Sequence, residues 1–285
     1  MRVAAAVDEL RGALEAGPRG SVGFVPTMGA LHEGHLALVA AARARSEVVV
    51  LSIFVNPMHF GPGEDYDGYP RAEGRDLELA AQAGVDVVFR PVTSDIYPPN
   101  QPGMVTVSAG PLGTVLEGAA RPGHFDGVLT VVAKLFNLIR PDQAWFGQKD
   151  AQQLALVKRM VTDLRFPVEI HACPTVRAPD GLAISSRNAY LSSEERVRAT
   201  VLHRALLAGR AALERGTGAG AAESAMAALV SSEPGVTLDY ARVVDPVTFG
   251  APQHGGPALV AGAVQVGATR LIDNLLWPLS GGEGA

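Results

Sequence analysis

The chain has 285 residues, 47% of them hydrophobic and 19% charged, which excludes a largely disordered protein and predicts about two domains. The formal net charge of −5 does not support binding to nucleic acid or to a membrane surface. The single cysteine, Cys173, excludes an internal disulfide framework and a cysteine-rich zinc module.

The N-terminal segment predicts an amphipathic helix, because Asp8 and Glu9 stand where a signal peptide would be apolar. No run of about 18 apolar residues predicts a membrane span, so we expect a cytoplasmic protein. Apolar strands then alternate with helices: strand 22–25, helix 35–45, strand 47–55, helix 71–83, strand 85–89, helix 125–139, strand 144–146, helix 150–163 and strand 168–172. This alternation predicts an α/β fold with a doubly wound parallel sheet covered on both faces.

After Pro174 the pattern changes. Ser192 opens a long predicted helix over 192–215, whose first turn is acidic. A glycine- and alanine-rich hinge at 216–220, a helix to about residue 230 and strands over 236–244 and 258–266 follow. We therefore expect a doubly wound domain over 1–175 and a smaller, lid-like α+β domain over 176–285.

The first candidate site lies where the first strand ends. Parallel sheets bind ligands at the carboxyl ends of their strands, near the point where strand order reverses. His32, Gly34 and His35 enter a helix there, and a helix start offers free N–H groups to phosphate. Histidines at i and i+3 share one helix face. Two other interpretations remain open: a zinc site, although HEGH lacks the HExxH spacing, or ordinary helix-start residues.

Four further polar segments lie at strand ends or near the domain boundary. They contain Asn56 and His59 after the second strand, Arg121 and His124 in a glycine-rich loop, Lys149, Asp150 and Gln153 after strand 144–146, and Ser185, Ser186 and Arg187 in a loop opened by Gly181. Three of them also have a plainer interpretation: a turn asparagine with a surface histidine, a solvated arginine, and an Asp-Gly turn with a helix-capping serine. Lys149 is one of three lysines and can neutralise phosphate charge, whereas Lys134 and Lys158 are expected at the surface.

Together these segments supply imidazole, guanidinium, ammonium, hydroxyl and amide groups with few carboxylates. That set fits an anionic nucleotide and stabilisation of a phosphoryl centre, and it does not fit hydrolysis by paired carboxylates. The sequence has no GxSxG elbow, no GxxxxGK[ST] loop and no GxGxxG after the first strand.

Six motifs occur in a characteristic order: PTMGALHEGH at 26–35, SIFVNP at 52–57, RPGHF at 121–125, FGQKDAQQ at 146–153, GLAISSRN at 181–188 and DYARVVDP at 239–246. The set resembles the pantothenate synthetase (pantoate–β-alanine ligase) family of HxGH nucleotidyltransferases. The resemblance implies a Rossmann-like fold, usually as a homodimer, and a two-step reaction that needs ATP and Mg²⁺. Pantoate and ATP give pantoyl adenylate and pyrophosphate, and β-alanine then gives pantothenate and AMP.

The resemblance also implies residue roles. His35 would contact the phosphates and His32 would donate a proton. The residues implied to hold phosphate and stabilise the pentavalent centre are Lys149, Ser185, Ser186 and Arg187. Those implied to border the rest of ATP are Met28, through its backbone, and Gly147, Asp150 and Val176. Those implied to line the pantoate site are Asn56, His59, Gln153, Arg121 and His124.

One position departs from the family pattern, because His59 stands where a second pantoate-binding glutamine is usual. A neutral imidazole offers a donor and an acceptor as an amide does, but it also titrates. The substitution predicts that pantoate is bound with an affinity that changes with pH. Two alternative functions remain open: another HxGH-type nucleotidyltransferase, which would want extra basic residues for a second phosphate, and a non-catalytic nucleotide-binding homologue.

Overall fold

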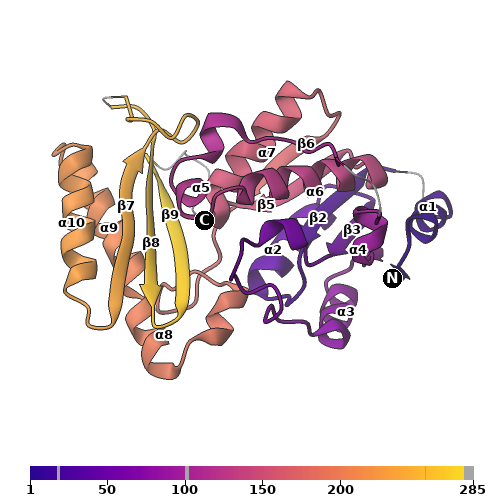
Figure 1. The fold of residues 1–285 in the computed structure, drawn as a ribbon, viewed down its shortest axis with the longest axis horizontal. Helices are drawn as coiled ribbons and strands as arrows, with labels where there is room; N and C mark the ends of the chain where they lie inside the picture. The colour runs from indigo at the N-terminus through magenta and orange to yellow at the C-terminus, as the bar shows by residue number, and fades with distance from the viewer. Residues whose placement is uncertain (18–19, 100–102, 254, 279–285) are drawn as a thin grey trace. The chain divides into compact units, whose positions relative to one another are not determined.

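The computed structural model of the protein describes residues 1–17, 20–99, 103–253 and 255–278 (Figure 1). The chain folds as two compact units. The first contains Met1–Gly147 and Gln152–Cys173, and the second contains Gln148–Ala151 and the chain from Pro174 onward. Among the described residues, no helix combines the length and the hydropathy that crossing a membrane would require.

The first unit is built on a six-stranded sheet with the order β1-β4-β3-β2-β5-β6, in which every neighbouring pair is parallel. The strands are β1 (Arg2–Ala4), β2 (Val22–Thr27), β3 (Val48–Ile53), β4 (Val87–Phe89), β5 (Gln143–Gly147) and β6 (Glu169–Cys173). This sheet, with helices on both faces, confirms the predicted Rossmann-like α/β fold.

Successive side chains of the central strands enter two different cores. Val48 and Val50 of β3 pack in one apolar cluster, whereas Val49 and Leu51 pack in another. The first cluster includes side chains of α1 (Val7–Glu15), α6 (His124–Ile139) and α7 (Ala151–Asp163), and the second includes those of α2 (Glu33–Arg43) and α3 (Glu73–Gln82). Because side chains alternate along a strand, a strand buried on both faces must be apolar throughout, and this explains the continuous apolar runs.

The order of strands reverses beside β2. From β2 the chain moves outward through β3 to β4, and it later returns to β5 on the other side of β2. Ligands of doubly wound sheets bind at the carboxyl ends of the strands that flank such a reversal. The segments that follow β2 and β5 are therefore the first places to look for a site.

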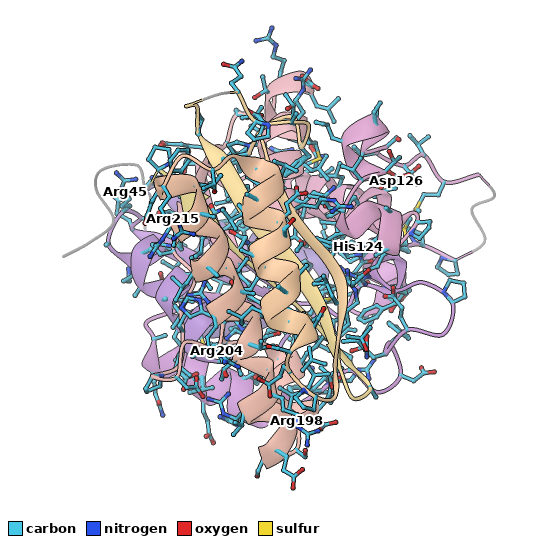
Figure 2. The ribbon with its side chains drawn as sticks, turned by 90° about the vertical axis from the view of Figure 1, so that its left-hand side faces the viewer. Arg45, His124, Asp126, Arg198, Arg204 and Arg215 are labelled. Atoms are coloured by element: carbon cyan, nitrogen blue, oxygen red, sulfur yellow. The ribbon has the colours of Figure 1, made fainter. Side chains whose placement is uncertain are left out.

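The second unit is built on the antiparallel sheet β7-β8-β9, formed by Val236–Val244, Ala258–Val266 and Thr269–Trp277. Helices α9 (Val201–Glu214) and α10 (Ala219–Ser231) cover one face of it (Figure 2). Leu206, Met226 and Val260 join these layers in a separate core. Its other helical segments are η3 (Gln148–Asp150), η4 (Ser186–Tyr190) and α8 (Ser193–Ala199).

Some predicted elements differ from the structure. The helix expected over 192–215 is two helices that break at Thr200, whose hydroxyl donates to the carbonyl oxygen of Val197 at 2.7 Å. Threonine hydroxyls that bond back to the preceding turn bend helices. The expected hinge at 216–220 is shorter, because α10 already begins at Ala219. Strands β1 and β9 were not predicted: β1 has only three residues, and polar side chains such as Asp273 and Asn274 interrupt β9.

The remaining helical segments of the first unit are short. They are η1 (Pro57–His59), α4 (Thr93–Ile96), η2 (Gly110–Gly113) and α5 (Glu117–Ala120). Of these, η1 matters most for the site, because it continues from the carboxyl end of β3 and contains His59.

Candidate active site

The HxGH segment follows β2 and starts α2. The rings of His32 and His35 stack face to face, with centroids 4.0 Å apart and planes 20° apart. A Cβ atom at Gly34 would lie 2.9 Å from the Cε1 atom of His32, closer than a side chain tolerates. An alanine at position 34 would therefore push the His32 ring away from the place that it occupies over the start of the helix.

The turn before this pair is held by a buried carboxylate that the sequence did not reveal. Asp76, from α3, is 2% exposed and accepts the backbone N–H groups of Ala30 and Leu31, each at 2.8 Å. Gly29 and Ala30 both have positive φ, 81° and 50°. Because such a backbone is costly for alanine, the bonds from Asp76 explain how the turn after Met28 is maintained.

Asn56 anchors the segment after β3. The residue is 2% exposed, and its side-chain amide nitrogen donates to the carbonyl oxygen of Gly127 at 3.1 Å. Its Oδ1 atom accepts from the Met58 N–H at 3.2 Å and from the Tyr97 hydroxyl at 2.8 Å. Burial raises the pKa of Tyr97, so its hydroxyl stays a neutral donor. Asn56 thus ties η1 to α6.

Arg121 and His124 form one network with Glu64 and the backbone of His59. Arg121 Nε donates to Glu64 Oε1 at 2.9 Å, and Arg121 Nη2 donates to Glu64 Oε2 at 2.5 Å and to the His59 carbonyl at 2.9 Å. The His59 ring lies edge-on to the His124 ring, with centroids 4.3 Å apart. The structure thus brings His59, Arg121 and His124 together as the sequence predicts. Glu64 was missed, since nothing in its loop marks it.

The partners of His124 fix its protonation state. His124 Nδ1 lies 2.9 Å from the His59 carbonyl oxygen, and its Nε2 lies 3.1 Å from Arg121 Nη1. A carbonyl can only accept and a guanidinium can only donate, so Nδ1 carries the proton and Nε2 accepts. Burial, and after it the charge of Arg121, lowers the pKa of His124 to about 4. His124 is therefore a neutral, structural imidazole at physiological pH.

Helix α7 carries two adjacent glutamines with different environments. Gln152 is 5% exposed; its Oε1 accepts from the Glu117 N–H at 3.1 Å, and its Nε2 donates to the carbonyls of Leu112 and Val115. Gln153 is half-buried. Gln152 thus holds the backbone of residues 112–117 in place, and Gln153 remains the predicted pantoate ligand. Met28, after β2, and Gly147, the last residue of β5, are also half-buried.

In the second unit, Lys149 lies on the 3₁₀ turn η3. Its Nζ is 3.6 Å from Asp150 Oδ1, and 19% of its side chain is exposed. The other two lysines differ from each other. Lys158 is exposed, as expected. Lys134 is half-buried, with its Nζ 5.5 Å from the centroid of the Tyr97 ring, so it is less exposed than a solvated surface lysine.

Local hydrogen bonds shape the loop that contains Ser185, Ser186 and Arg187. Ser185 Oγ accepts the Arg187 N–H at 3.3 Å, and the Ile184 N–H donates to the Val176 carbonyl at 3.0 Å. All three predicted phosphate-binding residues, and Val176, are half-buried. The Arg177–Asp273 ion pair, with Nη1–Oδ2 at 2.5 Å, ties the start of this loop to β9.

The described residues contain no cluster of three or more histidine, cysteine, aspartate or glutamate side chains suited to a metal ion. The zinc interpretation of His32 and His35 therefore gains no third protein ligand within the described ranges. The pair instead presents two imidazoles at the start of a helix, where N–H groups favour an anion.

Comparisons with known proteins agree with the motifs. The family model for pantoate-beta-alanine ligase matches residues 2–276. The chain is 56% identical over 265 residues to the pantothenate synthetase of Thermobifida fusca, covering 90% of this chain and 89% of that protein, and 53% identical to that of Acidothermus cellulolyticus, covering 96% and 90%.

Solved structures give the same result. The pantothenate synthetase of Thermus thermophilus is 51% identical and superposes with a TM-score of 0.89, covering 96% of this chain and 99% of that one. The pantoate-beta-alanine ligase of Francisella tularensis, solved with beta-gamma ATP and β-alanine, is 33% identical with a TM-score of 0.80, covering 97% of each chain. The chain therefore belongs to the pantoate–β-alanine ligase family.

Proposed function

We propose that the protein is an AMP-forming ligase that joins pantoate and β-alanine to give pantothenate at the expense of ATP. The observation that carries this proposal is the stacked His32–His35 pair, which directly follows the strand beside which the sheet order reverses. The names of the similar proteins support the same reaction, and the Francisella relative was solved with beta-gamma ATP and β-alanine.

The reaction proceeds in two steps. A pantoate carboxylate oxygen attacks the α-phosphorus of ATP, and the bond to the α–β bridging oxygen breaks as pyrophosphate leaves. The β-alanine amine then attacks the acyl carbon of pantoyl adenylate, loses a proton and displaces AMP. Because adenylation itself creates the leaving group, the protein has to orient the reactants and stabilise charge.

The proposed roles follow the chemistry of each side chain. His35 donates a hydrogen bond to phosphate, and His32 donates a proton as negative charge develops. Lys149 and Arg187 neutralise phosphate oxygens, with hydroxyl donors from Ser185 and Ser186. Met28, Gly147, Asp150 and Val176 border the rest of the nucleotide.

For pantoate, the contacts separate direct ligands from supporting residues. We assign His59 and Gln153, which are half-buried, to direct contact with pantoate. We add the second side-chain N–H of Asn56, since its Nδ2 has one bond, to the Gly127 carbonyl, within the described part of the chain. Arg121 and His124 both bond the carbonyl oxygen of His59, so they line the site by fixing the position of that residue.

Mg²⁺ is proposed as the ion that accompanies ATP. Mg²⁺ in phosphate-transfer sites is held mainly by substrate phosphates and water, with one or two carboxylates, and this fits a described chain with no preformed cluster of metal-binding side chains. When bound, the ion would offset phosphate charge, and Asp150, whose Oδ1 lies 3.6 Å from Lys149 Nζ, is a carboxylate that could hold it. We also propose a cytoplasmic homodimer, with residues 1–175 as the ATP- and pantoate-binding domain and 176–285 as a lid domain.

Pantoate-dependent exchange of labelled pyrophosphate into ATP tests the function. We expect exchange that requires pantoate and does not require β-alanine, because the first step alone is reversible. Exchange with a phosphorylated substrate and without pantoate would identify another HxGH-type nucleotidyltransferase. Binding of ATP without any exchange would identify a non-catalytic homologue.

Lys149→Ala tests the assignment of the phosphate-binding cation. We expect kcat for exchange to fall by about 100-fold or more, the usual effect of removing one stabilising group from a charged transition state, with little change in the unfolding midpoint. Lys158→Ala is the matched control, because Lys158 is an exposed lysine on the helix that follows. A Lys149→Ala enzyme with near wild-type kcat would remove Lys149 from the mechanism.

A further inference from the structure

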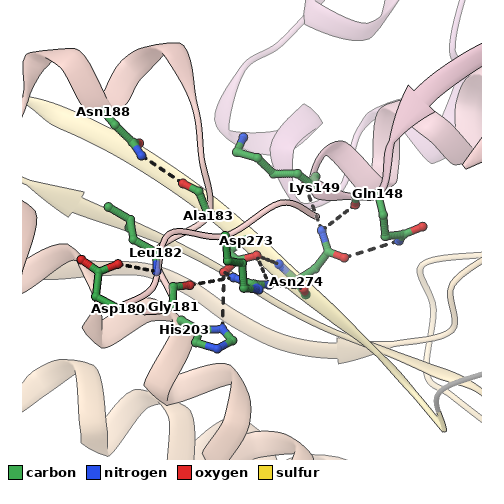
Figure 3. Close-up of polar contacts among 11 residues, drawn as sticks. Gln148, Lys149, Asp180, Gly181, Leu182, Ala183, Asn188, His203, Asp273 and Asn274 are labelled. Atoms are coloured by element: carbon green, nitrogen blue, oxygen red, sulfur yellow. Dashed lines mark hydrogen bonds and ion pairs between the residues drawn. The ribbon is translucent and has the colours of Figure 1, made fainter. Parts of the chain in front are cut away.

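The buried side-chain amide of Asn274 forms hydrogen bonds to the turn that contains Lys149. Asn274 lies in β9 and is 5% exposed. Its Nδ2 donates to the carbonyl oxygens of Gln148 at 3.0 Å and Lys149 at 2.8 Å, and its Oδ1 accepts from Gln148 Nε2 at 3.4 Å (Figure 3). The two amide hydrogens of Asn274 are thus donated to the carbonyl oxygens of two successive residues of η3.

This contact controls where the lysine side chain begins. A lysine ammonium sits at the end of a flexible four-carbon stem, so its position depends on the orientation of the backbone that carries it. Figure 3 shows the Lys149 side chain leaving the turn away from Asn274. Asn274 therefore holds Lys149 only through its backbone and leaves the ammonium available for other partners.

The neighbouring residue, Asp273, holds the other predicted phosphate-binding segment. Asp273 is 4% exposed and accepts two hydrogen bonds from Arg177, at 2.5 and 2.9 Å, while Arg177 also donates to the Gly181 carbonyl at 3.1 Å. Asp273 Oδ1 further accepts the backbone N–H of Asn274 at 2.7 Å. Two successive residues of β9 thus bond the turn of Lys149 and the loop that leads to Ser185.

A purely space-filling role does not account for this arrangement. A buried polar group costs free energy unless its hydrogen bonds are satisfied, and an aliphatic residue would fill the same volume. The amide instead satisfies carbonyls in a turn where η3 passes into α7. We propose that Asn274 is a positioning residue for the adenylation step, which acts by fixing the backbone of Lys149. This inference rests on the proposed function of Lys149 at the ATP phosphates.

A double-mutant cycle between Asn274→Ala and Lys149→Ala tests the proposal. We expect Asn274→Ala to lower kcat for pantoate-dependent exchange by about 100-fold, the effect that a misplacement near 1 Å can have, with a smaller change in the KM for pantoate. In the Lys149→Ala background the same substitution should change kcat by less than about twofold, because the group it positions is gone. A loss of the same factor in both backgrounds would overturn the proposal.

Two more variants separate positioning from stability. Asn274→Asp keeps the shape but removes the donors, so we expect it to lose activity as Asn274→Ala does; wild-type kcat in that variant would also overturn the proposal. Asp239→Asn is the control, because it weakens the exposed ion pair to Arg270, a residue of the same strand as Asn274, and should leave kcat unchanged. All rates are compared at a temperature where every variant is folded.

Hydrogen exchange gives a readout that does not depend on turnover. Asn274→Ala should raise amide exchange in residues 148–153 while the rest of β9 stays protected, and unchanged exchange there would contradict the positioning role. If wild-type protein shows no pantoate-dependent pyrophosphate exchange, the proposed function fails. The hydrogen-exchange pattern of the turn would still decide whether Asn274 holds it.

Discussion

The neutral imidazole of His124 shows how single residues in this protein are defined by their partners. Its two nitrogens face a carbonyl that accepts and a guanidinium that donates. Protonation of Nε2 would make the ring a cation and would place its N–H against the N–H of Arg121 inside a buried site. The bidentate bond from Arg121 to Glu64 in turn lowers the pKa of Glu64, so this carboxylate stays charged and keeps the arginine in place.

The lowered pKa of His124 predicts a dependence of stability on pH. Its folded value of about 4 lies below the ordinary 6.5, so the unfolded chain binds the proton more tightly. Neutral His124 therefore makes its full contribution to the free energy of unfolding above pH 6.5. This contribution is lost as the pH falls toward 4, and the free energy of unfolding falls by about 3 kcal/mol over the whole interval.

Urea unfolding of the wild type and of His124→Gln measures this contribution of His124 to the free energy of unfolding. The measurements run from about pH 7.5 to about pH 4.5, an interval that spans the ordinary histidine range. The free energy of unfolding should fall more steeply with decreasing pH in the wild type, since other titrating groups are common to both proteins. Parallel curves for the two proteins would contradict the assignment.

His59 predicts a pH dependence of a different kind, in substrate affinity. Its ring lies beside His124 and Phe60, and Arg121 bonds its backbone carbonyl. Because an imidazole ordinarily changes charge between about pH 5 and 8, we expect the KM for pantoate to vary over that range. The His59→Gln variant should have a flatter profile. Equal profiles for the two enzymes would show that His59 does not titrate in contact with pantoate.

At the scale of elements, helix α6 and the turn η1 meet more closely than side chains usually allow. A Cβ atom at Gly127 would lie 1.9 Å from the carbonyl oxygen of Met58. The same close approach lets Asn56 bond the Gly127 carbonyl. Glycine at position 127 is therefore a requirement of the packing that places His59, in a helix where glycine is otherwise unfavourable.

Gly127→Ala should displace η1 from α6. We expect the free energy of unfolding to fall by about 1–3 kcal/mol from overpacking, and the KM for pantoate to rise while the KM for ATP changes less. The control is Gly12→Ala in α1, where a Cβ would have no atom of the described chain within 4 Å. That variant should be stabilised by up to about 1 kcal/mol. A stable Gly127→Ala enzyme with unchanged KM values would contradict this account of the contact.

At the scale of the whole molecule, each unit has its own core. The strands of the first unit send side chains into two apolar clusters, and the second unit buries a separate cluster between its sheet and helices. The unit boundary does not follow the chain strictly, because Gln148–Ala151 belongs with the second unit. Lys149 accordingly takes its backbone partner from β9, 125 residues further along the chain.

The sequence by itself determined the fold class, the order of most elements and the family. A strand that is buried on both faces is recognisable as a continuous apolar run, and a motif such as HEGH places predicted site residues at neighbouring positions. The same local reasoning explains why Gly34 accompanies His32 and His35, although its contact with the His32 ring required the structure.

Only the tertiary structure revealed that Glu64, Asp76, Gln152, Asp273 and Asn274 bond groups in distant segments of the chain. Each bonds a partner at least 35 residues away, as in the contact of Gln152 with Glu117. Whether a carboxylate or amide meets such a partner depends on how distant elements pack, and a local sequence pattern does not predict which distant elements pack together. The sequence therefore predicted which groups suit the chemistry, and the packing decided which distant residues bond the segments around them.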